Sequence, residues 1–151
     1  MDRECKMPVT ILMADDDADD RFLSQFAFKR LEVDHTLEFV SDGEQMMNYL
    51  NSKLNSNEAL PDVILLDLNM PKKNGKETLK EIKSHDVLKK LKVIIFSTSK
   101  LHEDMNVTKE LGAESYIVKP NNLQNLMAVY RKICDQFGES NSLDKPQELY
   151  Q

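Results

Sequence analysis

The chain has 151 residues, a length that suits one compact domain with a sizeable core and leaves little room for a second. Its 26 acidic residues outnumber 20 basic ones, and the formal net charge of -6 opposes binding to a phosphate backbone. The two cysteines, Cys5 and Cys134, argue against a disulfide framework or a structural zinc site, and no apolar run approaches the roughly 20 residues that cross a bilayer. We therefore expect a cytoplasmic protein that binds neither nucleic acid nor membrane.

Short apolar segments rich in branched residues alternate with segments of helical periodicity along the chain. The predicted strands cover residues 9–14, 36–40, 63–67, 92–97 and 115–119. The predicted helices cover residues 20–31, 44–50, 76–83, 102–112 and 122–137. In the first helix, the apolar stripe expected to face the core consists of Leu23, Phe26, Ala27 and Leu31. The polar residues 138–151 are predicted to form a mobile tail outside a folded domain of residues 1–137.

The third and fourth predicted strands are almost continuously apolar, which is typical of strands covered by helices on both faces. Five successive strand and helix pairs then predict an α/β fold, a doubly wound five-stranded parallel sheet with helices on both sides. Right-handed crossovers place any site of such a sheet at the carboxyl ends of its strands.

Polar residues stand where four of the five predicted strands stop. They are Asp15 and Asp16 after the first strand, Asp67 after the third, Ser97 at the end of the fourth, and Lys119 with Pro120 after the fifth. Three carboxylates at one edge repel one another unless a cation neutralises them, and Mg²⁺ prefers such oxygen ligands. The sequence therefore predicts a Mg²⁺ site at this edge. The neighbouring Asp17, Asp19 and Asp20 are expected to form a solvated loop and helix start.

A carboxylate beside Mg²⁺, with a hydroxyl and an ammonium opposite, is suited to phosphoryl transfer. The metal and Lys119 would neutralise charge on the phosphoryl oxygens, while one carboxylate acts as the nucleophile. We expect Asp67 to be that nucleophile, because it ends the most apolar strand and the chain turns at Pro71 directly afterwards.

From about residue 9 to residue 137 the chain resembles the receiver domain of two-component response regulators, including the chemotaxis receivers. The residues that carry the resemblance, in the family's order and spacing, are Asp15, Asp16, the DLNMP motif at 67–71, Gly75, Ser97, Tyr116, Lys119 and Pro120. The resemblance implies a flavodoxin-like (βα)5 fold, a stand-alone receiver over residues 1–137, and transfer of a phosphoryl group from a histidine kinase onto Asp67.

The resemblance also implies how the metal is held. Asp16 and Asp67 would bind Mg²⁺ directly, Asp15 would act through water, and Asn69 would offer its backbone carbonyl. A cis bond between Lys119 and Pro120 is expected to aim the ammonium group inward.

Further roles follow from the same resemblance. Ser97 and Tyr116 would form the switch, while Asn69 and Ser99 would tune hydrolysis of the phosphoryl group. Serine in place of the commoner threonine at position 97, and aspartate in place of the phytochrome-associated subgroup's glutamate at position 15, change no required functional group, so they affect rates alone.

Residues 84–100 are similar to a longer segment in the phytochrome-associated single-domain receivers, which implies a sensor histidine kinase of phytochrome type as the partner. The expected output surface combines the fourth helix, the fifth strand and the fifth helix, with Met127 and Tyr130 as contact residues. This surface would mediate a homodimer, or contact with a kinase or effector.

Two alternatives share the predicted architecture. An aspartyl-phosphate phosphatase of haloacid dehalogenase type would place a second aspartate two residues after its nucleophile, where this chain has Asn69. A flavin-binding module would need a phosphate loop after the first strand, where the acidic residues 15–17 repel phosphate. The residues therefore favour a signalling receiver rather than an enzyme, one that catalyses only its own phosphorylation and dephosphorylation.

Overall fold

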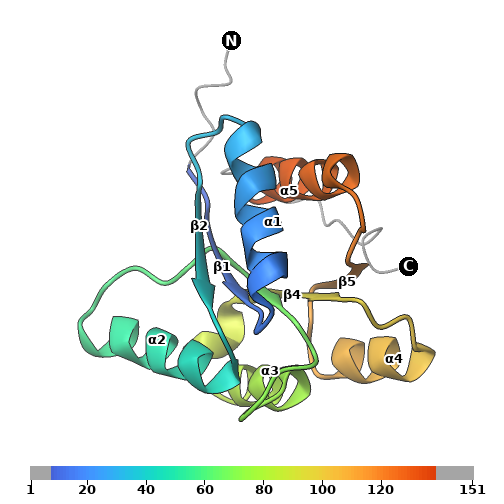
Figure 1. Ribbon diagram of the computed structural model, residues 1–151. Helices are drawn as coiled ribbons and strands as arrows, with labels where there is room; N and C mark the ends of the chain where they lie inside the picture. The colour runs from blue at the N-terminus through green and yellow to red at the C-terminus, as the bar shows by residue number, and fades with distance from the viewer. Residues whose placement is uncertain (1–7, 139–151) are drawn as a thin grey trace.

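The computed structural model of the protein describes residues 8–138, in which strands and helices alternate along the chain (Figure 1). The strands are β1 (Thr10–Ala14), β2 (Thr36–Val40), β3 (Val63–Leu66), β4 (Lys92–Ser97) and β5 (Ser115–Val118). The helices are α1 (Ala18–Arg30), α2 (Gly43–Asn55), α3 (Gly75–Lys83), α4 (His102–Glu110) and α5 (Leu123–Phe137), with a short 3-10 helix, η2 (Leu88–Lys90), before β4. The predicted order of elements is confirmed. All of the predicted tail except Gly138 lies outside the described residues.

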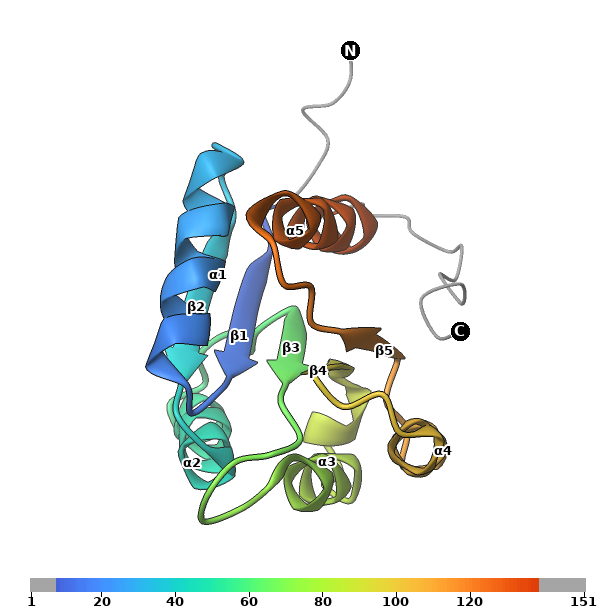
Figure 2. The same ribbon diagram turned by 45° about the vertical axis from the view of Figure 1, so that its right-hand side comes forward.

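The five strands form one parallel sheet in the order β2-β1-β3-β4-β5. The chain passes from β1 to one side to form β2 and then returns past β1 to form β3. Ligand sites of doubly wound sheets lie at such a reversal, outside the carboxyl ends of the strands. The ends of β1 and β3 therefore define where a site is expected, and their arrowheads lie side by side in Figure 2.

Helices cover both faces of the sheet, as the sequence predicts. Helices α1 and α5 lie on one face, and α2, α3 and α4 lie on the other (Figure 2). Successive strand residues alternate between the two cores: Ile11 and Met13 pack on the α1 side, whereas Leu12 and Ala14 pack on the α2 side. All four residues of β3 have no exposed surface, which explains the unbroken apolar run in its sequence.

The predicted apolar stripe of α1 is partly wrong. Leu23 and Phe26 are 47% and 42% exposed, and the helix instead turns Ser24, Ala27 and Phe28 toward the core. The reason lies in the neighbouring helix, because the Phe28 ring meets Tyr130 of α5 edge to face at 5.7 Å. The same pairing makes Tyr130 fully buried, so the expectation that it contacts a partner protein is also wrong.

Among residues 8–138, no helix combines the length and the apolar character needed to cross a membrane.

Candidate functional site

Three carboxylates meet where β1 and β3 end. One carboxylate oxygen from each of Asp15, Asp16 and Asp67 lies within 4.8 Å of the other two. The backbone holds them there, because the Asp67 N–H donates to the Ala14 carbonyl at 3.1 Å and extends the pairing of β1 with β3. Asp15 is fully buried and Asp67 is 8% exposed, whereas Asp16 faces solvent. The structure thus brings together the three acidic residues that the sequence predicts as metal ligands.

Lys119 supplies the opposite charge. Its Nζ lies 2.5 Å from Asp15 Oδ2, 2.9 Å from Asp20 Oδ2 and 3.2 Å from Asp67 Oδ2, and its side chain is 8% exposed. Burial alone would lower the pKa of Lys119, but the hydrogen bonds that it donates to Asp15 and Asp20 and the charge on Asp67 raise it overall. The ammonium group therefore stays charged at the edge of the sheet.

The pKa of Asp15 indicates that the Lys119 ammonium group does not fully offset the negative charge of the three carboxylates. Burial raises the pKa of Asp15, and the nearby charge of Asp67 raises it further, against the opposing hydrogen bonds from Lys119 and from the Asp17 N–H. A hard dication at this position would stabilise the charged carboxylates, and these oxygen donors are those that Mg²⁺ or Mn²⁺ prefers. The residues present therefore fit a divalent metal.

Asp20 takes part in the cluster, although the sequence interpretation assigned it to a solvated helix start. Asp17 and Asp19 do behave as expected: Asp17 caps α1 by accepting a hydrogen bond from the Asp19 N–H at 2.9 Å. Asp20 lies in the first turn of α1, and from there its carboxylate reaches Lys119. Asp20 is the third residue of α1, and no local pattern in the sequence distinguishes it from Asp17 and Asp19.

The predicted cis bond between Lys119 and Pro120 is wrong, because every peptide bond of residues 8–138 is trans. The inward direction of the Lys119 side chain has another cause. The Lys119 N–H donates to the Ser97 carbonyl at 2.8 Å, which continues the pairing of β5 with β4 by one residue beyond the strand. The extended ladder is enough to place the ammonium group among the carboxylates.

Ser97 and Tyr116 are both buried, and both contact Ser99. The Ser97 Oγ accepts a hydrogen bond from the Ser99 N–H at 3.2 Å, and the Tyr116 hydroxyl donates to the Ser99 carbonyl at 2.8 Å. Tyr116 therefore already occupies an inward position, 5% exposed, beside the loop that joins β4 to α4.

A pocket of about 500 Å³ opens beside the cluster. Its lining residues are Asp16, Leu68, Asn69, Met70, Pro71, Asn74, Lys76 and Asp104. The Asn69 N–H makes a long contact of 3.5 Å with Asp67 Oδ1, as expected for a residue two positions further along the turn. Gly75 lets α3 begin close by, since a Cβ there would lie 2.3 Å from the Asp67 carbonyl oxygen. The pocket therefore borders the acidic cluster at Asp16.

Comparison with known proteins finds relatives of this chain among the response regulators. The sequence pattern of the response regulator receiver domain matches residues 11–131. Response regulator Rcp1 of Synechocystis sp. is 36% identical over 134 residues, which are 88% of this chain and 91% of the relative.

Two solved structures are similar over almost their whole length. The crystal structure of the Mn(2+)-bound form of Rcp1 is 35% identical with a TM-score of 0.76, covering 91% of this chain and 99% of the other. The phosphorylated cyanobacterial phytochrome response regulator RcpA is 35% identical with a TM-score of 0.78, covering 92% and 99%. These matches support the receiver and not the phosphatase alternative, and the chain belongs to the response regulator receiver domain family.

Proposed function

We propose that Asp67 accepts a phosphoryl group from a histidine kinase and that the phosphorylated protein signals through contacts with other proteins. Receiver domains are signalling proteins that interact with histidine kinases. The observation that carries the assignment to Asp67 is the cluster itself, in which a nearly buried carboxylate lies among two further carboxylates and the Lys119 ammonium group.

In the proposed step, a carboxylate oxygen of Asp67 attacks the phosphorus atom of the donor. The bond from phosphorus to the donor's imidazole nitrogen breaks, and that nitrogen leaves with the bonding electron pair. Lys119, 3.2 Å from Asp67 Oδ2, neutralises charge on the transferred oxygens, and the Ser97 hydroxyl is the proposed second contact for them. The protein catalyses this step and the later hydrolysis on itself alone.

Receiver domains bind a divalent metal ion, and one of the similar structures is a Mn(2+)-bound form. For this chain we propose Mg²⁺, with Asp15, Asp16, Asp67 and the Asn69 backbone carbonyl as the residues that hold it or its water. When bound, the ion supplies positive charge that stabilises the transferring phosphoryl oxygens.

Intact-mass spectrometry tests the assignment. Acetyl phosphate with Mg²⁺ should add one phosphoryl group to the protein, and Asp67→Asn should abolish the addition, because an amide is a poor nucleophile. Asp86→Asn, which replaces an exposed aspartate, is the matched control and should be labelled like the unmodified protein. Equal labelling of Asp67→Asn would overturn the assignment.

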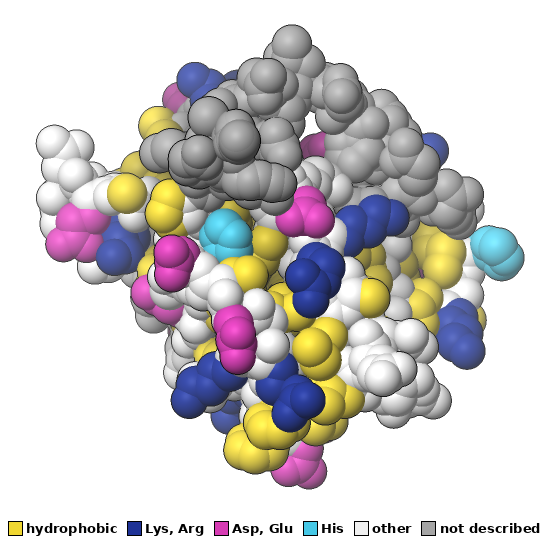
Figure 3. All heavy atoms as spheres, turned by 90° about the horizontal axis from the view of Figure 1, so that it is seen from above, with side chains coloured by type: hydrophobic (Ala, Val, Ile, Leu, Met, Phe, Trp, Pro, Cys, Tyr) yellow, Lys and Arg dark blue, Asp and Glu magenta, His cyan; other side chains and the backbone are white. Residues whose placement is uncertain are grey.

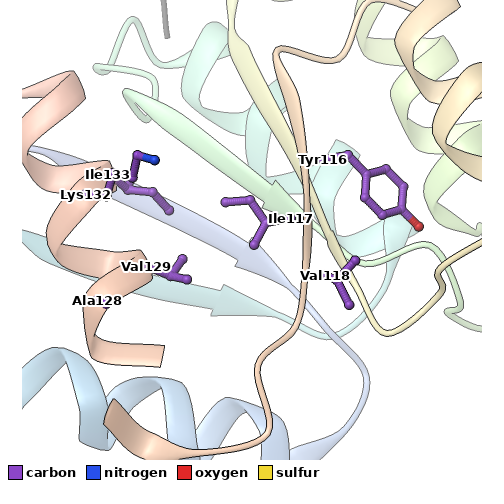
Figure 4. Close-up of a pocket in the computed structure, with 7 residues that line it drawn as sticks. All are labelled: Tyr116, Ile117, Val118, Ala128, Val129, Lys132 and Ile133. Atoms are coloured by element: carbon purple, nitrogen blue, oxygen red, sulfur yellow. The ribbon is translucent and has the colours of Figure 1, made fainter. Parts of the chain in front are cut away.

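The proposed output surface is formed by α4, β5 and α5. Strand β5 is at the edge of the sheet, and its side chains alternate: Figure 4 shows Ile117 directed toward Val129 and Ile133 of α5, whereas Tyr116 points to the other side. An apolar pocket of about 360 Å³ lies between β5 and α5. Burial of this groove in a homodimer is the arrangement that we propose, with the half-buried Met127 of α5 as a further contact residue.

We further propose a phytochrome-type kinase, because RcpA is described as a phytochrome response regulator. Protein partners rather than nucleic acid are consistent with the surface in Figure 3, where basic and acidic side chains are interspersed, and with the net charge of -6. A cytoplasmic location is proposed because it is where a kinase transfers its phosphoryl group. Transfer from a purified phytochrome kinase, compared with an unrelated sensor kinase, tests the pairing.

A further inference from the structure

An ion pair joins the first turns of α3 and α4 at the pocket that borders the acidic cluster. Lys76 Nζ lies 2.6 Å from Asp104 Oδ1. Both residues line that pocket together with Asp16 and Asn69. Neither Lys76 nor Asp104 belongs to the acidic cluster or to the residues that hold the metal, so their role there needs a separate explanation.

Asp104 makes a second contact besides its ion pair with Lys76. Its second oxygen, Oδ2, accepts a hydrogen bond from Ser99 Oγ at 2.5 Å, and its side chain is only 16% exposed. The bonds from Lys76 and then from Ser99 hold the pKa of Asp104 below its usual value, and the hydrogen bond to Asp104 raises the pKa of Lys76. Both groups are therefore charged at neutral pH, and Asp104 links Lys76 to Ser99.

Ser99 in turn contacts both residues of the proposed switch. Its N–H donates to Ser97 Oγ at 3.2 Å, and its carbonyl accepts from the Tyr116 hydroxyl at 2.8 Å. Every polar group of Ser99 is thus engaged: the side chain by Asp104, the N–H by Ser97, and the carbonyl by Tyr116. A shift of Ser99 changes all three contacts together.

We propose that Asp104, held in place by Lys76, is a positioning residue that fixes Ser99 where its carbonyl keeps Tyr116 buried. The inference rests on the proposed function in one respect: movement of the Ser97 hydroxyl to a phosphoryl oxygen on Asp67 reaches Ser99 through their hydrogen bond. The ion pair of Lys76 with Asp104, here called the bridge, favours the buried position of Tyr116. A phosphoryl group or its mimic on Asp67 favours the same position. By linkage, loss of the bridge weakens binding of a phosphoryl mimic at Asp67.

A simpler reading gives Ser99 a local role alone. Its Oγ also accepts a hydrogen bond from the Leu101 N–H at 3.3 Å, at the start of α4, where Leu101 itself provides no side-chain cap. On that reading Asp104 and Ser99 stabilise the start of α4. Lys76 would then have no effect, because it belongs to α3. Replacement of Lys76 therefore separates the two readings.

The experiment compares the unmodified full chain with four variants. Asp104→Asn and Lys76→Gln each remove one charge of this ion pair, whereas Lys76→Arg keeps the charge. Lys53→Gln is the matched control, since Lys53 of α2 forms an ion pair at 3.1 Å with Glu58, which follows the helix, and neither residue belongs to the site. Thermal melting checks that each form folds. If Asp104→Asn fails to fold, Lys76→Gln opens the same bridge.

The first readout is nitration of Tyr116 by tetranitromethane, mapped by peptide mass spectrometry without any phosphoryl donor. Tyr130, which is fully buried, serves as the internal reference. Asp104→Asn and Lys76→Gln should each raise the nitration rate of Tyr116 roughly two- to fivefold, the range expected for a partly exposed ion pair. The second readout is calorimetric titration with beryllofluoride and Mg²⁺, in which the same two variants should bind about two- to fivefold more weakly.

The two readouts separate the inference from the proposed function. Failure of the unmodified protein to bind beryllofluoride would overturn the function of Asp67, while nitration still tests the bridge. Unchanged nitration and affinity in Lys76→Gln, equal to those of Lys53→Gln, would overturn the inference. So would a Lys76→Arg variant that folds but is as altered as Lys76→Gln.

Discussion

Helices α4 and α5 follow neighbouring strands of the sheet, yet they are anchored very differently. Helix α5 buries Leu126, Tyr130, Ile133 and Cys134, and Tyr130 lies between the rings of Phe28 and Phe96. Helix α4 has one buried residue, Thr108, and its first turn is held by the polar contacts of Asp104. The site therefore stands between a firmly packed side and a side held mainly by hydrogen bonds.

This difference in packing indicates that the two sides of the site have different roles. Lys119, which holds the carboxylates, comes from the strand that leads into α5, whereas Ser97 and Ser99 lead into α4. Elements with few buried apolar contacts open at the lowest free energy, and moving parts of switches are drawn from them. We therefore expect the α5 side to set stability and the α4 side to carry the response.

The strongest expected effect is the loss of Lys119 from the firmly packed side. Lys119→Met leaves the fully buried Asp15 carboxylate without its ammonium partner, which should lower the free energy of unfolding by roughly 3–5 kcal/mol. Lys119→Arg keeps the charge and should lose less. Urea unfolding measures both, and a loss below about 1 kcal/mol for Lys119→Met would contradict the proposed role of this cluster in stability.

The packing contrast is tested by a matched pair of truncations. Ile133→Ala in α5 removes a fully buried side chain and should destabilise the fold by about 2–5 kcal/mol. Val107→Ala in α4, where the side chain is half-buried, should cost about 1 kcal/mol or less. Chemical denaturation of both variants decides the matter, and equal losses would remove the contrast between the helices.

Mg²⁺ should stabilise the unmodified protein by relieving repulsion among the carboxylates. At tenfold excess over its Kd the ion should add about 1.4 kcal/mol to the free energy of unfolding. Asp16→Ala removes an exposed member of the cluster and should lose this gain while leaving the packing intact. The measurement is the melting temperature with and without Mg²⁺; an unmodified protein that is indifferent to Mg²⁺ would count against the metal site.

The smallest expected effect concerns the pH dependence of Asp15 without divalent metal. Burial raises the pKa of Asp15 above its ordinary value of 3.8. The contribution of the neutral Asp15 carboxyl to the free energy of unfolding is therefore complete below the ordinary pKa. It is lost as the pH rises through the raised pKa of the folded protein. Asp15→Asn, which is always neutral, should be more stable than the unmodified protein at neutral pH, and its advantage should shrink as the pH falls toward about 4. A constant advantage across this range would show that the charge of Asp15 is not its cause.

The fold could be predicted from the sequence because its signals are local. The unbroken apolar run of β3 and the alternation of strands with helices each depend on a few neighbouring residues. The face of α1 could not be predicted, because its apolar residues fit two stripes of equal spacing, and the contact of Phe28 with Tyr130, far along the chain, selects one.

The main charged residues of the site could also be predicted from the sequence. Asp15, Asp16, Asp67 and Lys119 come together because each ends a strand of one parallel sheet. Two further contacts depend on distances that only the folded chain defines: the bond of Asp20 to Lys119, 99 positions apart, and the ion pair of Lys76 with Asp104. No local pattern marks either of them. The inward direction of Lys119 likewise depends on the pairing of β4 and β5, which distant parts of the chain form.

The central claim is that occupancy of Asp67 is transmitted through Ser97 and Ser99 to α4. A backbone NMR shift map with and without beryllofluoride and Mg²⁺ tests it most directly. Large shifts are expected at the carboxyl ends of β1 and β3, and they should continue through Ser99 and Asp104 to Tyr116. Shifts that stay at the strand ends and never reach Tyr116 or α4 would contradict the account, even with Asp67 fully occupied.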